Sequence, residues 1–178
     1  ATAKMDANGH TTLFAYDVMN RLTDMTDPLF RVTHFSYDEV GNLKTKTDPK
    51  SQMLTFTYDL ANRLTKVTFP DSSTRDIAYD DVGNRLTLTD AHTNLAFTYD
   101  AVNRLQPITD SAYAPAKVVA YAYDNVGNRT SLTTPEGTVF SNTYDAADRL
   151  DLVKRGLATE ANYDYDAAGR RIRLTLGN

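Results

Sequence analysis

Alternating large and small side chains recur along this chain at an interval of about 21 residues. A large residue, a small residue and a tyrosine follow one another, as in Phe14-Ala15-Tyr16. An alternation of period two places the large side chains on one face of a β-strand. The pattern therefore predicts a short, two-faced strand that ends at each tyrosine. Its first large positions are Phe14, Phe35, Phe56, Ile77, Phe97, Tyr121, Asn142 and Tyr163, of which only Asn142 breaks the stripe.

Each of these tyrosines is followed by aspartate, and the pairs mark a tandem repeat. Successive tyrosines lie 21, 21, 21, 20, 24, 21 and 21 residues apart. A fixed period of this length is typical of repeat architectures, so it decides the fold before any single element is assigned. The pairs are Tyr16-Asp17, Tyr37-Asp38, Tyr58-Asp59, Tyr79-Asp80, Tyr99-Asp100, Tyr123-Asp124, Tyr144-Asp145 and Tyr165-Asp166.

The residue four places after each tyrosine is always Asn, Asp or Gly. These three types best tolerate a positive φ angle. Aspartate is favoured at the first position of a type I turn, so each Y-D-x-x-(G/N) predicts a hairpin turn with a G1-type bulge. The aspartate is accordingly interpreted first as a turn residue. The turn positions are Asn20, Gly41, Asn62, Gly83, Asn103, Gly127, Asp148 and Gly169.

A second strand is predicted beyond each turn. Nine residues past the tyrosine stand Met25, Lys46, Val67, Leu88, Ile108, Leu132, Val153 and Leu174, with Lys46 the one departure. The apolar residue nearer the turn is Leu22, Leu43, Leu64, Leu105 or Leu150, six after the tyrosine, but Leu86 and Ile172 come seven after it. A shift of one residue reverses the two faces of a strand. We therefore expect two variants of the turn.

The connections between repeats carry other turn signals, and no segment shows helical periodicity. They include Asp27-Pro28, Asp48-Pro49, Pro70-Asp71, Asp90-Ala91 and Thr134-Pro135-Glu136-Gly137, and the insertion 111–117 predicts a longer loop. The expected fold class is all-β: tandem β-hairpin repeats of about 16 strands, forming a continuous twisted or spiralling antiparallel sheet, tube or shell segment. Residues 1–178 are expected to be a single array of about eight repeats of about 21 residues, incomplete at both ends.

Composition narrows the possible partners. Nineteen Lys and Arg against 23 Asp and Glu give a net charge of −4 without a basic block, which argues against nucleic acid as a partner. No apolar run approaches the roughly 18 to 20 residues of a membrane helix. The chain has no cysteine, which excludes disulfides and thiolate chemistry. It opens at Ala1 without methionine, which suggests a processed product or part of a longer protein.

Candidate catalytic groups are sparse. His10, His34 and His92 fall at different repeat positions, so neither a metal site nor a histidine-based catalytic pair is predicted from them. The sequence also lacks a phosphate-binding glycine loop, a nucleophile elbow and a zinc-ligand spacing. We expect no catalytic residue, no metal ligand and no cofactor, and hence a protein that is not an enzyme.

Two features of the repeat leave alternatives open. Arginines five or six residues after the tyrosine favour cross-strand pairs and turn hydrogen bonds with the aspartates, with calcium bound between aspartates as the alternative. The aromatic stripe favours a half-buried sheet face, with stacking on sugar rings as the alternative, although the chain has no tryptophan. The arginines are Arg21, Arg63, Arg85, Arg104, Arg129, Arg149 and Arg171.

The recurring pattern F-x-Y-D-x-x-(G/N)-(N/R)-(R/L)-L-T resembles the YD repeats of the Rhs family, which includes bacterial Rhs toxins, toxin-complex shell subunits and teneurins. The resemblance covers nearly the whole chain. It implies hairpins joined edge to edge into a spiralling sheet that encloses a toxin cargo or forms a cell-surface barrel for adhesion. The C-terminal D-P-x-G core motif, the aspartates beside it that would drive self-cleavage, and a toxin domain are absent from this sequence. Eight repeats are also too few to enclose a cavity.

The chain starts and stops inside a repeat, since 2–17 match the second half of a repeat such as 86–100. It is therefore a fragment, or its sheet continues by pairing with another copy. We expect a non-catalytic structural scaffold of a cell-surface or secreted assembly, located outside the cell and able to continue end to end as a fibre or tube. Its partners would be sheet edges of other copies or flanking repeats. The alternatives are a fragment of a toxin-encapsulating shell, with toxin cargo, and a glycan-binding adhesion module.

Overall fold

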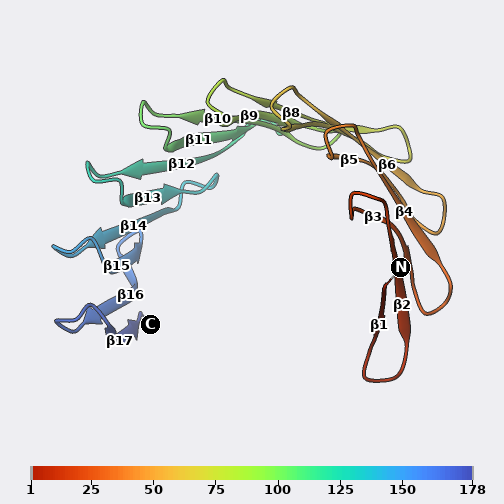
Figure 1. The fold of residues 1–178 in the computed structure, drawn as a ribbon. Coiled ribbons are helices and arrows are strands. Elements are labelled where there is room, and N and C mark those ends of the chain that lie inside the picture. Colours follow the sequence, from red (N-terminus) through yellow and green to blue (C-terminus); the bar gives the residue numbers. More distant parts are fainter. Residues whose placement is uncertain (1, 178) are drawn as a thin grey trace. The chain divides into compact units, whose positions relative to one another are not determined.

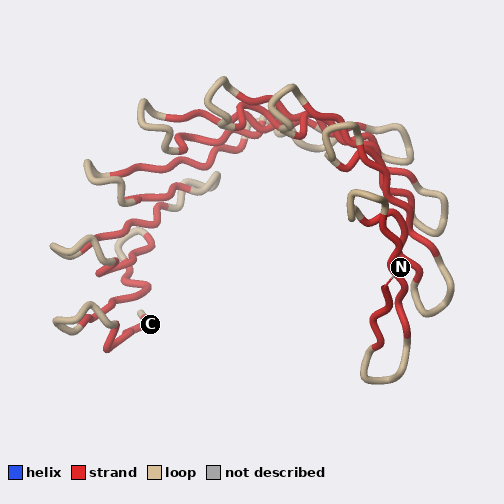
Figure 2. Tube along the Cα trace, in the orientation of Figure 1, coloured by secondary structure: helices blue, strands red, loops and turns tan. Residues whose placement is uncertain are grey.

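The computed structural model describes residues 2–177, which form 17 β-strands and no helix (Figure 2). The predicted all-β fold of antiparallel hairpins is confirmed. Eight Tyr-Asp hairpins account for sixteen strands, and β1 (Thr2–Met5) is the additional one. Within the described residues, no helix is present that could cross a membrane.

Contacts between Cα atoms divide the chain into two compact units. The first comprises residues up to Ala78 together with Leu88–His92, and the second comprises Tyr79–Thr87 and the residues from Thr93 onward. The hairpin of β8 (Thr74–Tyr79) and β9 (Arg85–Thr89) therefore contributes residues to both. Before it come β2 (Thr11–Tyr16), β3 (Leu22–Thr26), β4 (Val32–Tyr37), β5 (Leu43–Thr47), β6 (Met53–Tyr58) and β7 (Leu64–Thr68). After it come β10 (Asn94–Tyr99), β11 (Leu105–Asp110), β12 (Lys117–Tyr123), β13 (Arg129–Thr133), β14 (Val139–Tyr144), β15 (Leu150–Arg155), β16 (Ala158–Tyr165) and β17 (Arg171–Leu176).

Consecutive strands within each unit pair in the antiparallel sense, as the ribbon in Figure 1 shows. Phe14 lies opposite Met25 in the first unit, and Tyr163 lies opposite Leu174 in the second. The large residue two places before the tyrosine is thus paired with the residue nine places after it. At each of these tyrosines the register shifts by one residue, so Tyr16 lies opposite Leu22. This shift is the bulge that the turn pattern predicts.

The two turn variants expected from Leu86 and Ile172 are not found. Tyr165 lies opposite Arg171, six residues on, in the same register as Tyr16 and Leu22. Ile172 is instead the residue that the bulge leaves without a partner in the register, and 66% of its surface is exposed; Leu86, at the same repeat position, is 39% exposed. The turn keeps one length because hydrogen bonds of its own backbone define it, whatever apolar residue follows.

Arginine replaces leucine at the sixth position in three repeats. The guanidinium carbon of each lies near an aromatic ring: Arg85 at 5.6 Å from the centroid of Phe97, Arg129 at 6.0 Å from Tyr121, and Arg171 at 6.0 Å from Tyr163. A long aliphatic stem and a planar cation can cover an aromatic face while the charge stays in water. These arginines therefore take the place of leucine beside the aromatic residues of the strand face. A search for apolar residues in the sequence does not find them.

The connections at the opposite edge of the hairpins use similar turn chemistry. The amide of Phe30 donates to the carbonyl of Asp27 at 2.9 Å, and that of Ser51 donates to the carbonyl of Asp48 at 2.9 Å. Their φ angles are 58° and 62°. The segment between β11 and β12 forms the loop predicted for the insertion.

The sheet of each unit has very little buried interior. Among the described residues only Thr33 and Ala161 are buried, each 7% exposed, and no large side chain is fully buried. The aromatic and aliphatic residues of the stripe are half-buried between neighbours on the same face. In such repeat structures stability comes mainly from contacts between adjacent repeats rather than from a central core.

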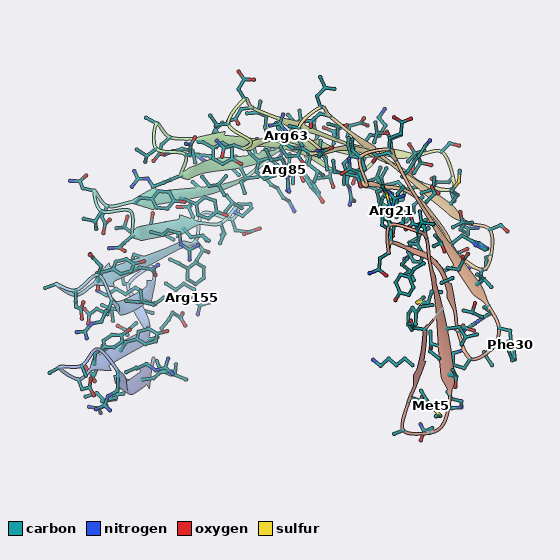
Figure 3. All side chains as sticks on the ribbon, viewed as in Figure 1. Met5, Arg21, Phe30, Arg63, Arg85 and Arg155 are labelled. Atoms are coloured by element: carbon teal, nitrogen blue, oxygen red, sulfur yellow. The ribbon has the colours of Figure 1, made fainter. Side chains whose placement is uncertain are left out.

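Phe30 provides a test of the turn geometry, because it adopts a left-handed backbone while its side chain, which projects at the tip of the β3–β4 turn, is 85% exposed (Figure 3). Phe30→Asn should raise the free energy of unfolding by about 1 kcal/mol, since asparagine tolerates this region better. Thermal unfolding of the two proteins measures the difference.

The matched control is Leu29→Asn, which makes a similar exchange at the neighbouring residue, 70% exposed and without a positive φ angle. Equal effects of the two substitutions would contradict this account of Phe30.

Candidate functional site

The eight Tyr-Asp turns share one hydrogen-bonded geometry. In the first, the Oδ1 atom of Asp17 accepts hydrogen bonds from the amides of Met19 and Arg21, both at 2.9 Å. The amide of Asn20 donates to the carbonyl of Asp17 at 3.0 Å, which closes the turn. The residue four places after the tyrosine has the left-handed backbone expected for it. The φ angles are 61° at Asn20, 99° at Gly41, 60° at Asn62, 98° at Gly83, 62° at Asn103, 104° at Gly127, 56° at Asp148 and 80° at Gly169.

These contacts favour the ionised form of the turn aspartates. The backbone amide of Arg21 lowers the pKa of Asp17 most, and the Arg21 guanidinium adds to the effect. The same causes lower the pKa of Asp59 and of Asp100. Hydrogen bonds to a carboxylate lower its pKa because they stabilise the charged form.

The fifth residue after the tyrosine binds the second carboxylate oxygen. Where this residue is arginine, its Nε atom donates to Oδ2 of the turn aspartate at 2.6 to 2.7 Å. Where it is asparagine, its Nδ2 atom donates at 2.9 to 3.1 Å. The arginines are Arg21, Arg63, Arg104, Arg149 and Arg170, and the asparagines are Asn42, Asn84 and Asn128.

Three of the arginines assigned to turn aspartates from the sequence, Arg85, Arg129 and Arg171, do not bind them. The partner of Asp166 is Arg170 and not Arg171, because only the fifth position lies beside the carboxylate. For the same reason Arg85 and Arg129 face aromatic rings.

The tyrosine hydroxyl joins each hairpin to the one before it. The hydroxyl of Tyr37 donates to the carbonyl of Leu22, the sixth residue after the preceding tyrosine, at 2.9 Å. The same bond recurs from Tyr58 to Leu43, Tyr99 to Arg85, Tyr123 to Leu105, Tyr144 to Arg129 and Tyr165 to Leu150, at 2.9 to 3.0 Å. Burial, and secondly the negative charge of Asp38, raise the pKa of Tyr58. The tyrosine thus acts as both a strand-face residue and a link between repeats.

Arginine at the fifth position makes a second link, which we call the arginine junction. Arg104 donates from Nη1 to the carbonyl of Asp124 in the next repeat at 2.9 Å, and its guanidinium carbon lies 4.9 Å from the centroid of the Tyr123 ring. Arg21 contacts Asp38 and Tyr37 in the same way, at 3.4 and 4.8 Å. Arg149 contacts Asp166 and Tyr165 likewise, at 3.4 and 4.5 Å.

Asparagine at the fifth position makes a different link, the asparagine junction. The Nδ2 atom of Asn42 donates to Oδ1 of Asn62, the fourth residue after the next tyrosine, at 2.9 Å. Asn84 donates to Asn103 at 2.9 Å, and Asn128 donates to Asp148 at 3.0 Å. Each of these acceptors is an oxygen that glycine would not supply.

The two junctions alternate, a regularity that the sequence interpretation missed. Its signal is the dipeptide at the fourth and fifth positions, which repeats every second hairpin. The dipeptides are Asn20-Arg21, Gly41-Asn42, Asn62-Arg63, Gly83-Asn84, Asn103-Arg104, Gly127-Asn128, Asp148-Arg149 and Gly169-Arg170. The residues of the Tyr-Asp turns therefore repeat every two hairpins. The last hairpin departs from this pattern, because its glycine is followed by arginine.

The contacts of His34 and His10 do not form a catalytic arrangement. The Nδ1 atom of His34 contacts Oδ1 of Asp24, but the hydroxyl of Thr23 donates to Asp24 and not to the imidazole. His10 contacts Asp6 at 3.2 Å. Within residues 2–177 no group of three His, Cys, Asp or Glu side chains is placed to bind a metal ion. Calcium between the turn aspartates has no support, because arginine, asparagine and backbone amides already contact their oxygens.

A hollow of about 450 Å³ lies in the first unit, beside the Arg75–Asp90 ion pair. Arg75 donates to Oδ2 of Asp90 at 2.8 and 3.0 Å. Phe69, Asp71 and His92 are among the other residues that line it. The hollow is open to solvent, and Arg75 and Asp90 pair with each other, while Asp71 accepts hydrogen bonds from the amide and hydroxyl of Ser73.

Tyr123→Phe removes one link between repeats and should lower the free energy of unfolding by about 1 kcal/mol, the usual contribution of a hydrogen bond. Denaturant unfolding measures it. Tyr121→Phe is the matched control on the same strand, since none of the hydrogen bonds found within the described residues involves the Tyr121 hydroxyl. Equal losses from the two substitutions would show that the Tyr123 hydroxyl does not link the hairpins.

Acid should destabilise the protein through the turn aspartates. Their folded-state pKa lies below the ordinary value of 3.8, so the stability that they contribute is complete above that pH. It is lost as the pH falls through the lower, folded-state pKa, because the unfolded chain then binds more protons. The melting temperature should be level near neutrality and fall below pH 3.8. A melting temperature that is unchanged down to about pH 2 would contradict this prediction.

The RHS Repeat family model matches residues 1–29 and 31–74. No curated protein matches the sequence. The fold is similar to that in a crystal structure of TcdB2-TccC3 without its hypervariable C-terminal region, with a TM-score of 0.75, 16% identity, and coverage of 94% of this chain and 10% of that one. It is also similar to that in the Photorhabdus luminescens Tc holotoxin pore, with a TM-score of 0.65, 15% identity, and coverage of 98% and 12%. This chain thus spans about a tenth of the length of those chains. The sequence match identifies residues 1–29 and 31–74 as RHS (YD) repeats, and the hairpins that follow them share the same turn geometry.

Proposed function

We propose that this chain is a non-catalytic wall segment of a secreted or cell-surface assembly, in which flanking YD hairpins continue its sheet. The observation that supports this most directly is that the polar groups of the Tyr-Asp turns are engaged in contacts within the sheet. The tyrosine hydroxyl, the fifth-position side chain and the turn aspartate bind neighbouring repeats or their own turn. The repeat's most regular polar groups thus serve assembly of the sheet.

The near absence of buried residues also supports a wall segment. Among residues 2–177 only Thr33 and Ala161 are buried, so the sheet of each unit gains stability by adding neighbouring hairpins. Adhesion to glycans gains no support from this face, because most of its tyrosines are half-buried and their hydroxyls bind backbone carbonyls.

Joining identical copies end to end has less support than joining to flanking repeats. The first strand of each hairpin leads to the tyrosine and the second follows the turn. Between repeats, a second strand pairs with a first strand, as in β3–β4 and β15–β16. β1 and β17 are both second strands, so stacking of identical copies would place two second strands together. No such pair occurs among the pairings with a defined register in the described residues.

A toxin-encapsulating shell is the form of assembly that the structural neighbours favour. One of the similar structures reported above is a Tc holotoxin pore, and the chains in both structures are about eight to ten times longer than the part that matches. In that form the present hairpins would be a small part of the shell wall, and the cargo would be a toxin held inside it.

Mass photometry and negative-stain microscopy of the native material test the proposal. It predicts particles larger than the 19.8 kDa of this chain, with a wall that contains further YD repeats. Native particles of 19.8 kDa alone would contradict it, and filaments made only of this chain would replace it with the end-to-end fibre.

A further inference from the structure

Arg170 differs from the other fifth-position arginines in its exposure. It contacts Asp166 at 2.7 Å as they contact their own aspartates, yet its side chain is 81% exposed. The side chains of Arg21, Arg63, Arg104 and Arg149 are only 28 to 32% exposed. Where the covering group is defined, it is the tyrosine ring of the next hairpin. Arg170 therefore presents the donor side of an arginine junction without its acceptor side.

The strand beside Arg170 is equally uncovered. β17 is the edge strand of the second unit and pairs with β16, and all six of its residues are exposed. They include Ile172, Leu174 and Leu176, at 66%, 43% and 67%. Its first residue, Arg171, occupies the sixth position, whose carbonyl accepts a tyrosine hydroxyl in six other repeats. The same three groups bind the next hairpin elsewhere in the chain: a strand edge, a guanidinium and a backbone carbonyl. Here they are the edge of β17, the side chain of Arg170 and the carbonyl of Arg171.

The identity of the fifth residue predicts the fourth residue of the following hairpin. After Arg21, Arg63, Arg104 and Arg149 the next hairpin carries Gly41, Gly83, Gly127 and Gly169, and after Asn42, Asn84 and Asn128 it carries Asn62, Asn103 and Asp148.

Hydrogen bonding explains the asparagine half of this rule, and space contributes to the arginine half. A Cβ atom on Gly169 would lie 3.5 Å from Nη1 of Arg149, and one on Gly41 would lie 3.8 Å from Nη1 of Arg21, which are ordinary contacts that a longer side chain would crowd. A Cβ atom on Gly83 or Gly127 would meet no atom within 4 Å, so at these two positions it is the left-handed backbone that favours glycine. After asparagine the requirement reverses, because Nδ2 needs the oxygen of the next fourth residue.

We propose that the edge formed by β17 and Arg170 is a docking surface for a further hairpin of the type Tyr-Asp-x-x-Gly, and that it disfavours the type Tyr-Asp-x-x-Asn. The incoming tyrosine ring stacks on the Arg170 guanidinium and its hydroxyl donates to the carbonyl of Arg171. The carbonyl of the incoming aspartate accepts from Nη1 of Arg170, and the glycine leaves room for the guanidinium. This inference rests on the proposed continuation of the sheet and adds the rule that selects the next hairpin.

The test adds one hairpin to the full chain. A copy of residues 30–47, which contains Tyr37 and Gly41, is joined directly after Asn178 so that its tyrosine follows Tyr165 at the usual repeat spacing. The matched variant carries Gly41→Asn in the copy alone. Hydrogen–deuterium exchange then measures amide protection in β17 for both proteins and for the original chain.

The expected result is that the glycine hairpin raises protection in β17 about fivefold more than its asparagine variant does, from one cation–π contact and one hydrogen bond. Arg170→Asn in both extended proteins should abolish or reverse this preference, because the edge then offers an asparagine junction. Gly41→Asn also changes the stability of the turn itself, but this effect is the same with Arg170 and with Arg170→Asn. Comparing the two differences in protection therefore removes it.

The contrary outcomes are distinguishable. Equal protection by both hairpins, or a preference that Arg170→Asn leaves unchanged, would overturn the selection rule but leave sheet continuation in place. Failure of both hairpins to protect β17 would overturn the docking surface and the proposed wall function together.

Discussion

The structure depends on the aspartate that caps each left-handed turn. Its carboxylate binds the amides of the turn with one oxygen and the fifth-position side chain with the other. This fixes the length of the turn, so the sixth residue always lies opposite the tyrosine in the registers that are defined. A constant register then places the tyrosine hydroxyls of six repeats within hydrogen-bonding distance of the preceding repeat.

Because the repeats share this turn, small side-chain choices at the fourth and fifth positions control how one repeat meets the next. Arginine extends to the carbonyl and ring of the following Tyr-Asp pair, whereas asparagine reaches the following fourth residue. Whichever residue stands at the fifth position, it also donates a hydrogen bond to the turn aspartate of its own hairpin. The sheet of each unit is thus held together by nearest-neighbour contacts, as expected for a repeat protein with little buried interior.

The sequence predicted the strands, the bulged turns and the antiparallel pairing, since these follow from local pattern and backbone preference. It did not predict that Leu86 and Ile172 are left exposed at the seventh position, because an apolar pattern alone cannot show that a turn keeps its register when arginine takes the sixth position. Arg85 and Arg171 fill that position by covering aromatic rings with their long side chains. The junctions were missed for a related reason: they join residues about one repeat apart, and their signal appears only when alternate repeats are compared.

A double-mutant cycle between Arg104 and Tyr123 tests most directly whether the turn edge holds adjacent hairpins together. The cycle uses Arg104→Gln, Tyr123→Leu and the double variant, with unfolding free energies from denaturant titration. The account predicts a coupling of about 1 kcal/mol between these residues of neighbouring repeats. Additive effects, within about 0.3 kcal/mol, would show that the junction does not link the repeats and would contradict the account.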